Sequence, residues 1–195
     1  LSMARGESTM LERSTKAPPF SLPDTVSGST VSLDVARGKA GLLVAFICNH
    51  CPYVVHIRDT FAATARELQA RGIGVVAISA NDAIGYPADG PDKMAQEART
   101  AGYTFPYLFD ESQAVARAYT AACTPDFFLF DLDLKLVYRG QFDGSRPGNG
   151  EPVTGADLRR AADNLLADSG PIQEQKPSVG CSIKWRAGNE PSYFG

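Results

Sequence analysis

The sequence lacks the features of a membrane protein or a nucleic-acid-binding protein. No apolar run approaches the roughly 20 residues that a helix needs to cross a bilayer. The formal net charge of −3 offers no basic surface for nucleic acid or for an acidic membrane. Residues 1–20 carry charged side chains and no apolar stretch, which is not the pattern of a secretory signal. We therefore expect a globular protein in the cytoplasm with no nucleic-acid or membrane partner.

Cysteine and histidine are also scarce, with four and two residues among 195. Four cysteines in a chain of this length, without a secretory signal, do not suggest a disulfide framework. They favour catalytic, redox or metal-binding roles in a reducing compartment. A structural zinc site takes four ligands, usually from two Cys-x-x-Cys pairs, and Cys48 with Cys51 is the one such pair in the sequence. We accordingly expect no bound metal.

The sequence does contain a regular alternation of apolar runs and helical patterns. Leu42–Ile47 and Ile73–Ser79 are continuous apolar runs, typical of buried central strands. Between them, apolar residues recur at helical spacing over 53–70, and Arg71-Gly72 ends the pattern. The other predicted elements are a β-hairpin within 20–33, helices near 92–101, 112–119 and 156–167, and strands near 105–109, 127–130 and 134–138.

The alternation of strands and helices predicts one α/β domain over residues 20–170, in which the last two strands are antiparallel. Residues 1–19 are polar and end in two prolines, so we expect a flexible N-terminal arm. Residues 171–195 are rich in proline, glycine and polar side chains, so we expect a C-terminal tail without regular structure.

The most informative segment is Cys48-Asn49-His50-Cys51, where the first apolar run gives way to the helical pattern. Two thiols three residues apart at a helix start lie on one face, so they can close into a disulfide and open again. The helix N-terminus and a nearby histidine cation both favour the thiolate, the form that attacks disulfides and peroxides. The motif therefore predicts thiol redox chemistry, with His50 stabilising the Cys48 thiolate. The alternatives are an inert pair or part of a metal site, with His50 an ordinary surface residue.

Three blocks carry a resemblance to a known family: FICNHCPY over 46–53, CTPDFF over 123–128 and GCSIKW over 180–185. The element order around Cys-x-x-Cys, with a Thr-Pro pair before the last hairpin, resembles the thioredoxin fold. The blocks are similar to a bacterial peroxiredoxin-like group in the AhpC/TSA and TlpA-like branch of that fold. The resemblance implies a thioredoxin-like α/β fold, in which a central mixed sheet is flanked by helices, with an N-terminal β-hairpin extension and an irregular C-terminal tail.

The resemblance also implies roles for individual residues. Cys48 matches the attacking cysteine of thioredoxin-like oxidoreductases, and Cys51 matches the resolving cysteine. Pro125 matches the proline whose cis peptide bond faces the active site, a minority form that proteins keep for a reason. It would hold the backbone of Thr124 open to pair with an extended substrate segment. Phe46, beside the motif, is expected to be a wall of the substrate-binding surface.

One departure from the family pattern bears on function. Typical peroxiredoxins read Pro-x-x-x-Thr-x-x-Cys, and when Cys51 is aligned to the last position, Cys48 stands at the threonine and Val44 at the proline. Because the hydroxyl that holds a peroxide is missing, dithiol–disulfide exchange in cell redox homeostasis is the favoured function. Its substrate would be a protein or small-molecule disulfide. No dissociable cofactor is implied, since the sulfurs carry the electrons, and the oligomeric state stays open.

Two other functions remain open. A divergent thiol peroxidase with antioxidant activity would form a sulfenic acid on Cys48 or Cys51 from a peroxide, and another cysteine would resolve it. A metal-binding module would use Cys48, Cys51 and His50, since thiolates and imidazole suit Cu(I) or Zn.

Cys123 and Cys181 are the candidates for additional redox thiols. Cys123 precedes Thr124, near the expected active-site face, although a small buried apolar residue is the simpler interpretation. Cys181 lies in a segment with little core-forming pattern, so it would resolve an oxidised Cys48 or Cys51 provided that the tail folds back. A carboxylate beneath the second cysteine is common in thioredoxin-like proteins, but no residue clearly matches that position.

Overall fold

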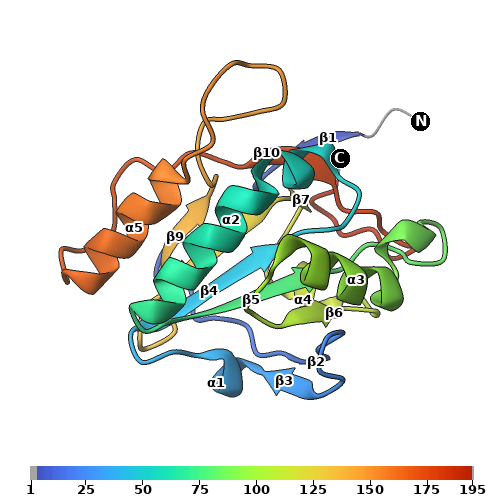
Figure 1. The fold of residues 1–195 in the computed structure, drawn as a ribbon, viewed down its shortest axis with the longest axis horizontal. Coiled ribbons are helices and arrows are strands. Elements are labelled where there is room, and N and C mark those ends of the chain that lie inside the picture. Colours follow the sequence, from blue (N-terminus) through green and yellow to red (C-terminus); the bar gives the residue numbers. More distant parts are fainter. Residues whose placement is uncertain (1–3, 195) are drawn as a thin grey trace.

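The computed structural model describes residues 4–194, and its centre is a five-stranded mixed sheet in the order β6-β5-β4-β8-β9 (Figure 1). β5 runs parallel to β4 and β6, whereas β8 lies antiparallel to β4 and β9. Every residue of β4 is buried, because this strand has a neighbour on each side and is covered on both faces. The bounds are Gly41–Phe46 for β4, Ile73–Ser79 for β5, Tyr107–Phe109 for β6, Asp126–Phe130 for β8 and Leu136–Gly140 for β9.

One face of this sheet packs against α2 (Pro52–Ala70), α3 (Pro91–Ala101) and α5 (Ala156–Leu166) (Figure 1). Successive side chains of a strand face opposite directions, so every second residue of β4 points to this side. Leu43 is one of them, and it shares a core cluster with Phe61 of α2. The predicted helix over 53–70 and the two buried central strands are therefore confirmed.

The other face of the sheet is covered by a β-hairpin and two short helices. Leu42 and Val44 of β4 point to this side and share a second core cluster with Val31 of the hairpin and Val115 of α4. The hairpin confirms the predicted N-terminal extension. The bounds are Ser21–Pro23 for β2, Thr30–Ser32 for β3, Leu33–Ala36 for α1 and Ala114–Ala118 for α4.

A second, three-stranded sheet in the order β1-β10-β7 brings both ends of the chain to the same place. β10 (Val179–Ser182) lies between β1 (Arg5–Glu7) and β7 (Cys123–Thr124) and is antiparallel to both. The segment expected to be a flexible arm therefore supplies a strand, and the tail expected to be irregular supplies another. The sequence contains no signal for either, because strands this short show no periodicity and their partners are distant along the chain.

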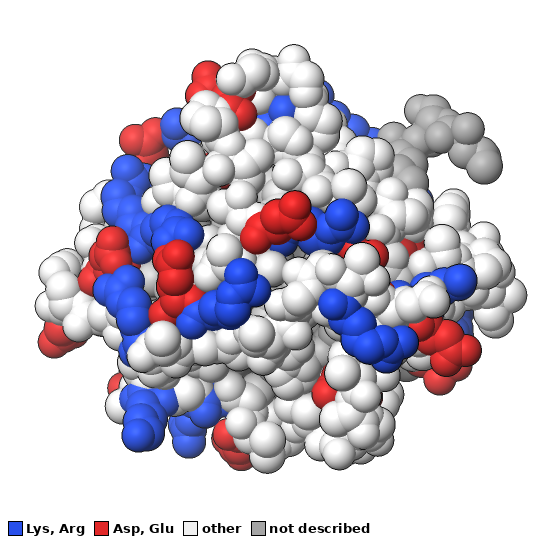
Figure 2. All heavy atoms as spheres, viewed as in Figure 1, with Lys and Arg blue, Asp and Glu red and all other residues white. Residues whose placement is uncertain are grey.

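The described surface has charges of both signs. Figure 2 shows acidic and basic side chains interspersed over the face formed by α2, α3 and α5. Some of them join the helices: Arg58 of α2 pairs with Glu97 of α3 at 2.9 Å, and Arg71 at the end of α2 pairs with Asp163 of α5 at 2.7 Å. Within residues 4–194, no helix is both long enough and apolar enough to span a membrane.

Candidate functional site

Cys48 and Cys51 lie at the junction between β4 and α2. α2 begins at Pro52, where the absent N–H sacrifices no helical hydrogen bond, and Cys51 is therefore its N-cap residue. The backbone N–H of Val54, in the first turn of the helix, donates to the Cys51 thiol. Cys48 lies three residues earlier, outside the helix, so the helix N-terminus acts on the second cysteine rather than on the first.

A third sulfur joins this pair. The Sγ atoms of Cys51 and Cys181 lie 2.6 Å apart, although 130 residues separate them in the sequence. The backbone carbonyl oxygen of Thr124 lies 3.4 Å from Cys51 Sγ, and the Thr124 hydroxyl lies 3.6 Å from Cys48 Sγ. All three cysteines are buried, with at most 4% of each residue exposed. The tail thus folds back onto the motif, which is the condition that the predicted role of Cys181 requires.

The contacts among the three thiols favour one thiolate, on Cys51. Hydrogen bonds from Cys181 and from Cys48 lower the pKa of Cys51. The hydrogen bond to Cys51, burial and the charge of Asp89 raise the pKa of Cys48. The hydrogen bond to Cys51 also raises the pKa of Cys181. The sequence predicts a thiolate on Cys48, whereas the directions of these pKa shifts favour a thiolate on Cys51.

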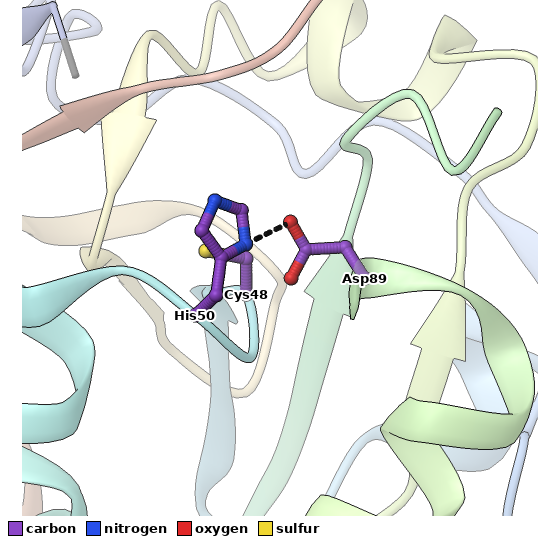
Figure 3. A group of neighbouring side chains, drawn as sticks. All are labelled: Cys48, His50 and Asp89. Atoms are coloured by element: carbon purple, nitrogen blue, oxygen red, sulfur yellow. Dashed lines mark ion pairs between the residues drawn. The ribbon is translucent and has the colours of Figure 1, made fainter. Parts of the chain in front are cut away.

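His50 points at this carboxylate (Figure 3). Its Nδ1 lies 2.6 Å from Asp89 Oδ2, and the Asp89 side chain is completely buried. The other oxygen of Asp89 accepts the backbone N–H of Asn49 at 2.8 Å, and Oδ2 also accepts the Asn81 amide at 2.8 Å. The imidazole that the sequence assigns to the Cys48 thiolate is therefore directed at Asp89. Sequence reasoning missed Asp89, because a Gly/Pro-rich loop gives no signal of which side chain will turn inward.

Cys48, His50 and Asp89 are also the group within residues 4–194 whose donor atoms come closest to a metal-binding arrangement, within 4.8 Å of one another. The metal-binding alternative used Cys51 as well, but Cys51 is not in this group. Three donors are one short of a closed structural zinc site. Both Asp89 oxygens already accept hydrogen bonds, so the residues fit a buried His–Asp pair better than a metal site.

The Thr124-Pro125 peptide bond is cis, as the resemblance implies. The backbone beside it, however, is not open to a substrate. β7 pairs with β10, with Thr124 opposite Cys181, so the chain's own tail occupies the edge that was expected to receive a substrate segment. The physical reason is that an unpaired strand edge is a template for pairing, and the tail satisfies it from within the same chain.

Phe46 and Cys123 are two further predicted site residues, and both are buried. Phe46 is 1% exposed and packs against the rings of Tyr119 and Phe128, with centroids 5.6 and 5.7 Å away. It belongs to the core cluster on the opposite face of the sheet from Cys48, so it is a packing residue and not a substrate-binding wall. The Cys123 thiol is fully buried, and burial raises its pKa. Its sulfur lies 3.9 Å from the backbone carbonyl oxygens of Pro125 and Ser178, which agrees with the simpler interpretation of a small buried residue.

A buried carboxyl group that the sequence analysis did not identify follows the cis proline. Asp126 is 1% exposed and accepts a hydrogen bond from the Ser8 hydroxyl at 2.7 Å through Oδ1. Its Oδ2 is buried and has no hydrogen-bond partner among residues 4–194, and burial raises the pKa of Asp126 to about 7. The sequence signal that could have identified Asp126 is its place in the CTPDFF block, directly after the proline. This carboxyl group belongs to β8, and its charge raises the pKa of Cys123.

Comparisons with known proteins agree with this arrangement. The model of the AhpC/TSA family matches residues 14–139. The curated "Putative peroxiredoxin Rv2521" of Mycobacterium tuberculosis is 30% identical over 115 residues, which are 59% of this chain and 68% of that protein. A crystal structure of an uncharacterized conserved protein from Geobacillus kaustophilus is 49% identical, with a TM-score of 0.93, and the match covers 95% of this chain and 98% of the other.

A more distant structure tests the fold alone. The crystal structure of "a putative Thiol:disulfide interchange protein DsbE from Chlorobium tepidum" is 22% identical, with a TM-score of 0.62, and the match covers 80% of this chain and 99% of the other. The predicted thioredoxin-like α/β fold is therefore confirmed.

Proposed function

Because the chain belongs to the AhpC/TSA family, which suggests a redox enzyme, we propose that it is a thiol–disulfide oxidoreductase whose working dithiol is Cys48 and Cys51. The observation that supports this most directly is the coupling of the two thiols at a helix N-cap. A hydrogen bond from Cys48 lowers the pKa of Cys51, which is the N-cap of α2 and lies near a cis proline. A stabilised thiolate within reach of a second thiol is what reversible disulfide exchange requires.

The coupling assigns a role to each sulfur. The Cys51 thiolate takes the proton of Cys48, and the resulting Cys48 thiolate attacks one sulfur of a substrate disulfide. A mixed disulfide forms on Cys48, and the substrate thiolate that leaves takes from Cys51 the proton that Cys48 gave up. The Cys51 thiolate then attacks Cys48 Sγ, forms the Cys48–Cys51 disulfide and releases the second half of the substrate as a thiolate, which takes a proton from solvent. Two electrons pass from the dithiol to the substrate.

Single-turnover reduction of a disulfide tests this proposal. The reduced protein is mixed with glutathione disulfide or insulin, and release of substrate thiol is followed. Cys48→Ser is expected to abolish the reaction, whereas Cys51→Ser is expected to stop at a mixed disulfide on Cys48 that is visible by mass. Cys123→Ser is the matched control, since it removes a buried cysteine whose contacts are backbone carbonyls. Full activity in Cys48→Ser would refute the assignment.

A thiol peroxidase is the second candidate, and one observation favours it. The hydroxyl missing from the peroxiredoxin pattern at position 48 has a spatial substitute, because the Thr124 hydroxyl lies 3.6 Å from Cys48 Sγ. The curated relative also has peroxiredoxin in its name. Stopped-flow consumption of hydrogen peroxide separates the two functions. Fast peroxide consumption that is lost in Thr124→Val, without reduction of insulin, would favour the peroxidase.

A further inference from the structure

We propose that Cys51 and Cys181 form a second redox disulfide, which takes over the oxidation first held by Cys48 and Cys51. This inference rests on the proposed function and assigns the tail a part in the reaction. Cys51 would then alternate between two partners, one three residues before it and one in the C-terminal tail. Cys48 would return to the thiol form within the same catalytic cycle.

The distance between the two sulfurs is the first support. A disulfide bond is about 2.03–2.05 Å long, and Cys51 Sγ lies 2.6 Å from Cys181 Sγ. Little movement is therefore needed to close the bond. Both residues are buried, at 0% and 4% exposure, so the two sulfurs face each other within the protein interior.

The position of Cys181 is fixed by backbone pairing on both sides. Thr124 lies opposite it in β7 and Arg5 lies opposite it in β1. A Cβ atom at the preceding Gly180 would lie 1.9 Å from the Thr124 carbonyl oxygen, so glycine is needed for β10 to come this close. Beyond the strand, the backbone N–H of Lys184 donates to an Asn81 side chain at 2.9 Å. The tail is thus held along the edge where a substrate segment would pair, and its cysteine stands where a substrate sulfur would face Cys51.

The change of charge during the reaction favours the transfer. Before oxidation, the hydrogen bond to Cys51 is the largest cause that raises the pKa of Cys181; burial is the next, and the Cys51 charge adds to both. Forming the Cys48–Cys51 disulfide removes the hydrogen bond and the charge, because Cys51 no longer carries a negative charge, whereas the effect of burial stays. The nearby Lys184 lowers the pKa of Cys181 and stays in place. Cys181 therefore becomes more acidic at the moment when its thiolate is needed.

The exchange balances without an additional reagent. The Cys181 thiolate, its proton having passed to solvent, attacks Cys51 Sγ. The Cys51–Cys181 bond forms, the Cys48–Cys51 bond breaks, and Cys48 leaves as a thiolate that takes up a proton. The oxidant for the whole sequence is the substrate disulfide, and a dithiol reductant returns Cys51 and Cys181 to thiols.

Disulfide mapping tests the inference. The reduced full chain is treated with one equivalent of glutathione disulfide, blocked with N-ethylmaleimide and digested with trypsin without reduction. Trypsin leaves Cys48 and Cys51 on one peptide, since no lysine or arginine lies between them, and places Cys181 on another. Two linked peptides with N-ethylmaleimide on Cys48 are expected. A wild-type product with only the Cys48–Cys51 disulfide and blocked Cys181 would overturn the inference.

Variants separate this inference from the proposed function. Cys181→Ser is expected to reduce its first equivalent of glutathione disulfide and to end as the Cys48–Cys51 disulfide. The wild type in excess glutathione disulfide is expected to carry glutathione on Cys48 in addition to the internal disulfide. If the wild type reduces the substrate but never links the two peptides, only the inference fails. If neither protein reduces the substrate, the proposed function fails as well.

Discussion

The buried carboxyl group of Asp126 leads to a quantitative prediction for the substitution Asp126→Asn. Burial raises the pKa of Asp126 from 3.8 to about 7 in the folded chain. Between these pH values the unfolded chain gives up the proton and the folded chain keeps it, so folding stability falls as the pH rises. A shift of about three units at about 1.36 kcal/mol per unit corresponds to a loss on the order of 4 kcal/mol between pH 4 and pH 8.

Asparagine has nearly the same shape and no proton to lose. It keeps an oxygen for the Ser8 hydroxyl, which donates to Asp126 at 2.7 Å. The variant and the wild type should therefore be about equally stable near pH 4. Above pH 7 the variant should be more stable by up to several kcal/mol, because the wild type must then hold a buried charge.

Urea unfolding at pH 4.5, 6, 7 and 8, followed by circular dichroism under reducing conditions, measures the difference at each pH. Asp133→Asn is the matched control. Asp133 is exposed, so the difference in unfolding free energy between this variant and the wild type should not increase with pH. The reasoning is wrong if Asp126→Asn is destabilised by the same amount at every pH. That result would mean that the carboxyl group contributes through hydrogen bonding and that its ionisation is not suppressed by burial.

Three further substitutions test other parts of the structure. Asp89→Asn removes a charge that raises the pKa of Cys48, so alkylation of Cys48 by iodoacetamide at pH 7 should become faster, about tenfold per unit of pKa; an unchanged rate would contradict this. Gly180→Ala places a Cβ against the Thr124 carbonyl, so urea unfolding should show a loss of about 1–3 kcal/mol, with less of the tail disulfide on peptide mapping. Phe61→Ala empties the centre of an aromatic cluster and should lower the free energy of unfolding by about 3–5 kcal/mol, and a loss below about 1 kcal/mol would show that the core collapses around the gap.

The elements that the sequence predicts well are those whose signal is local. β4 and β5 lie where continuous apolar runs place them, and α2 ends at Ala70, next to the predicted Arg71-Gly72 stop. β1 and β10 carry no such signal. Each is at most four residues long, and the two strands are held by pairing between opposite ends of the chain. Pairing of that kind depends on the completed fold and not on the nearby sequence.

In the candidate site too, the residues with a local sequence signal could be predicted and the others could not. The Cys-x-x-Cys spacing and the proline after Thr124 identify two sulfurs and the peptide bond that lies beside them. Which cysteine is the more acidic could not be predicted, because the pKa values of the thiols depend on groups from three separate segments. Asp89 and Cys181 reach the motif from a loop and from the tail, and neither is marked by a pattern of neighbouring residues.

The presence of Cys181 changes how any cysteine substitution at this site must be interpreted. Its thiol donates to Cys51 before oxidation, and Cys51 in turn raises the pKa of Cys48. Removing Cys181 therefore alters the reactivity of Cys48 even where no second disulfide forms, since interacting thiols titrate as a set. Serine at this position keeps a donor for the Cys51 thiolate and loses only the capacity to form the disulfide, whereas alanine loses both. A defect common to the two variants reports the covalent step, and a defect confined to alanine reports the hydrogen bond, because effects within one coupled network do not add.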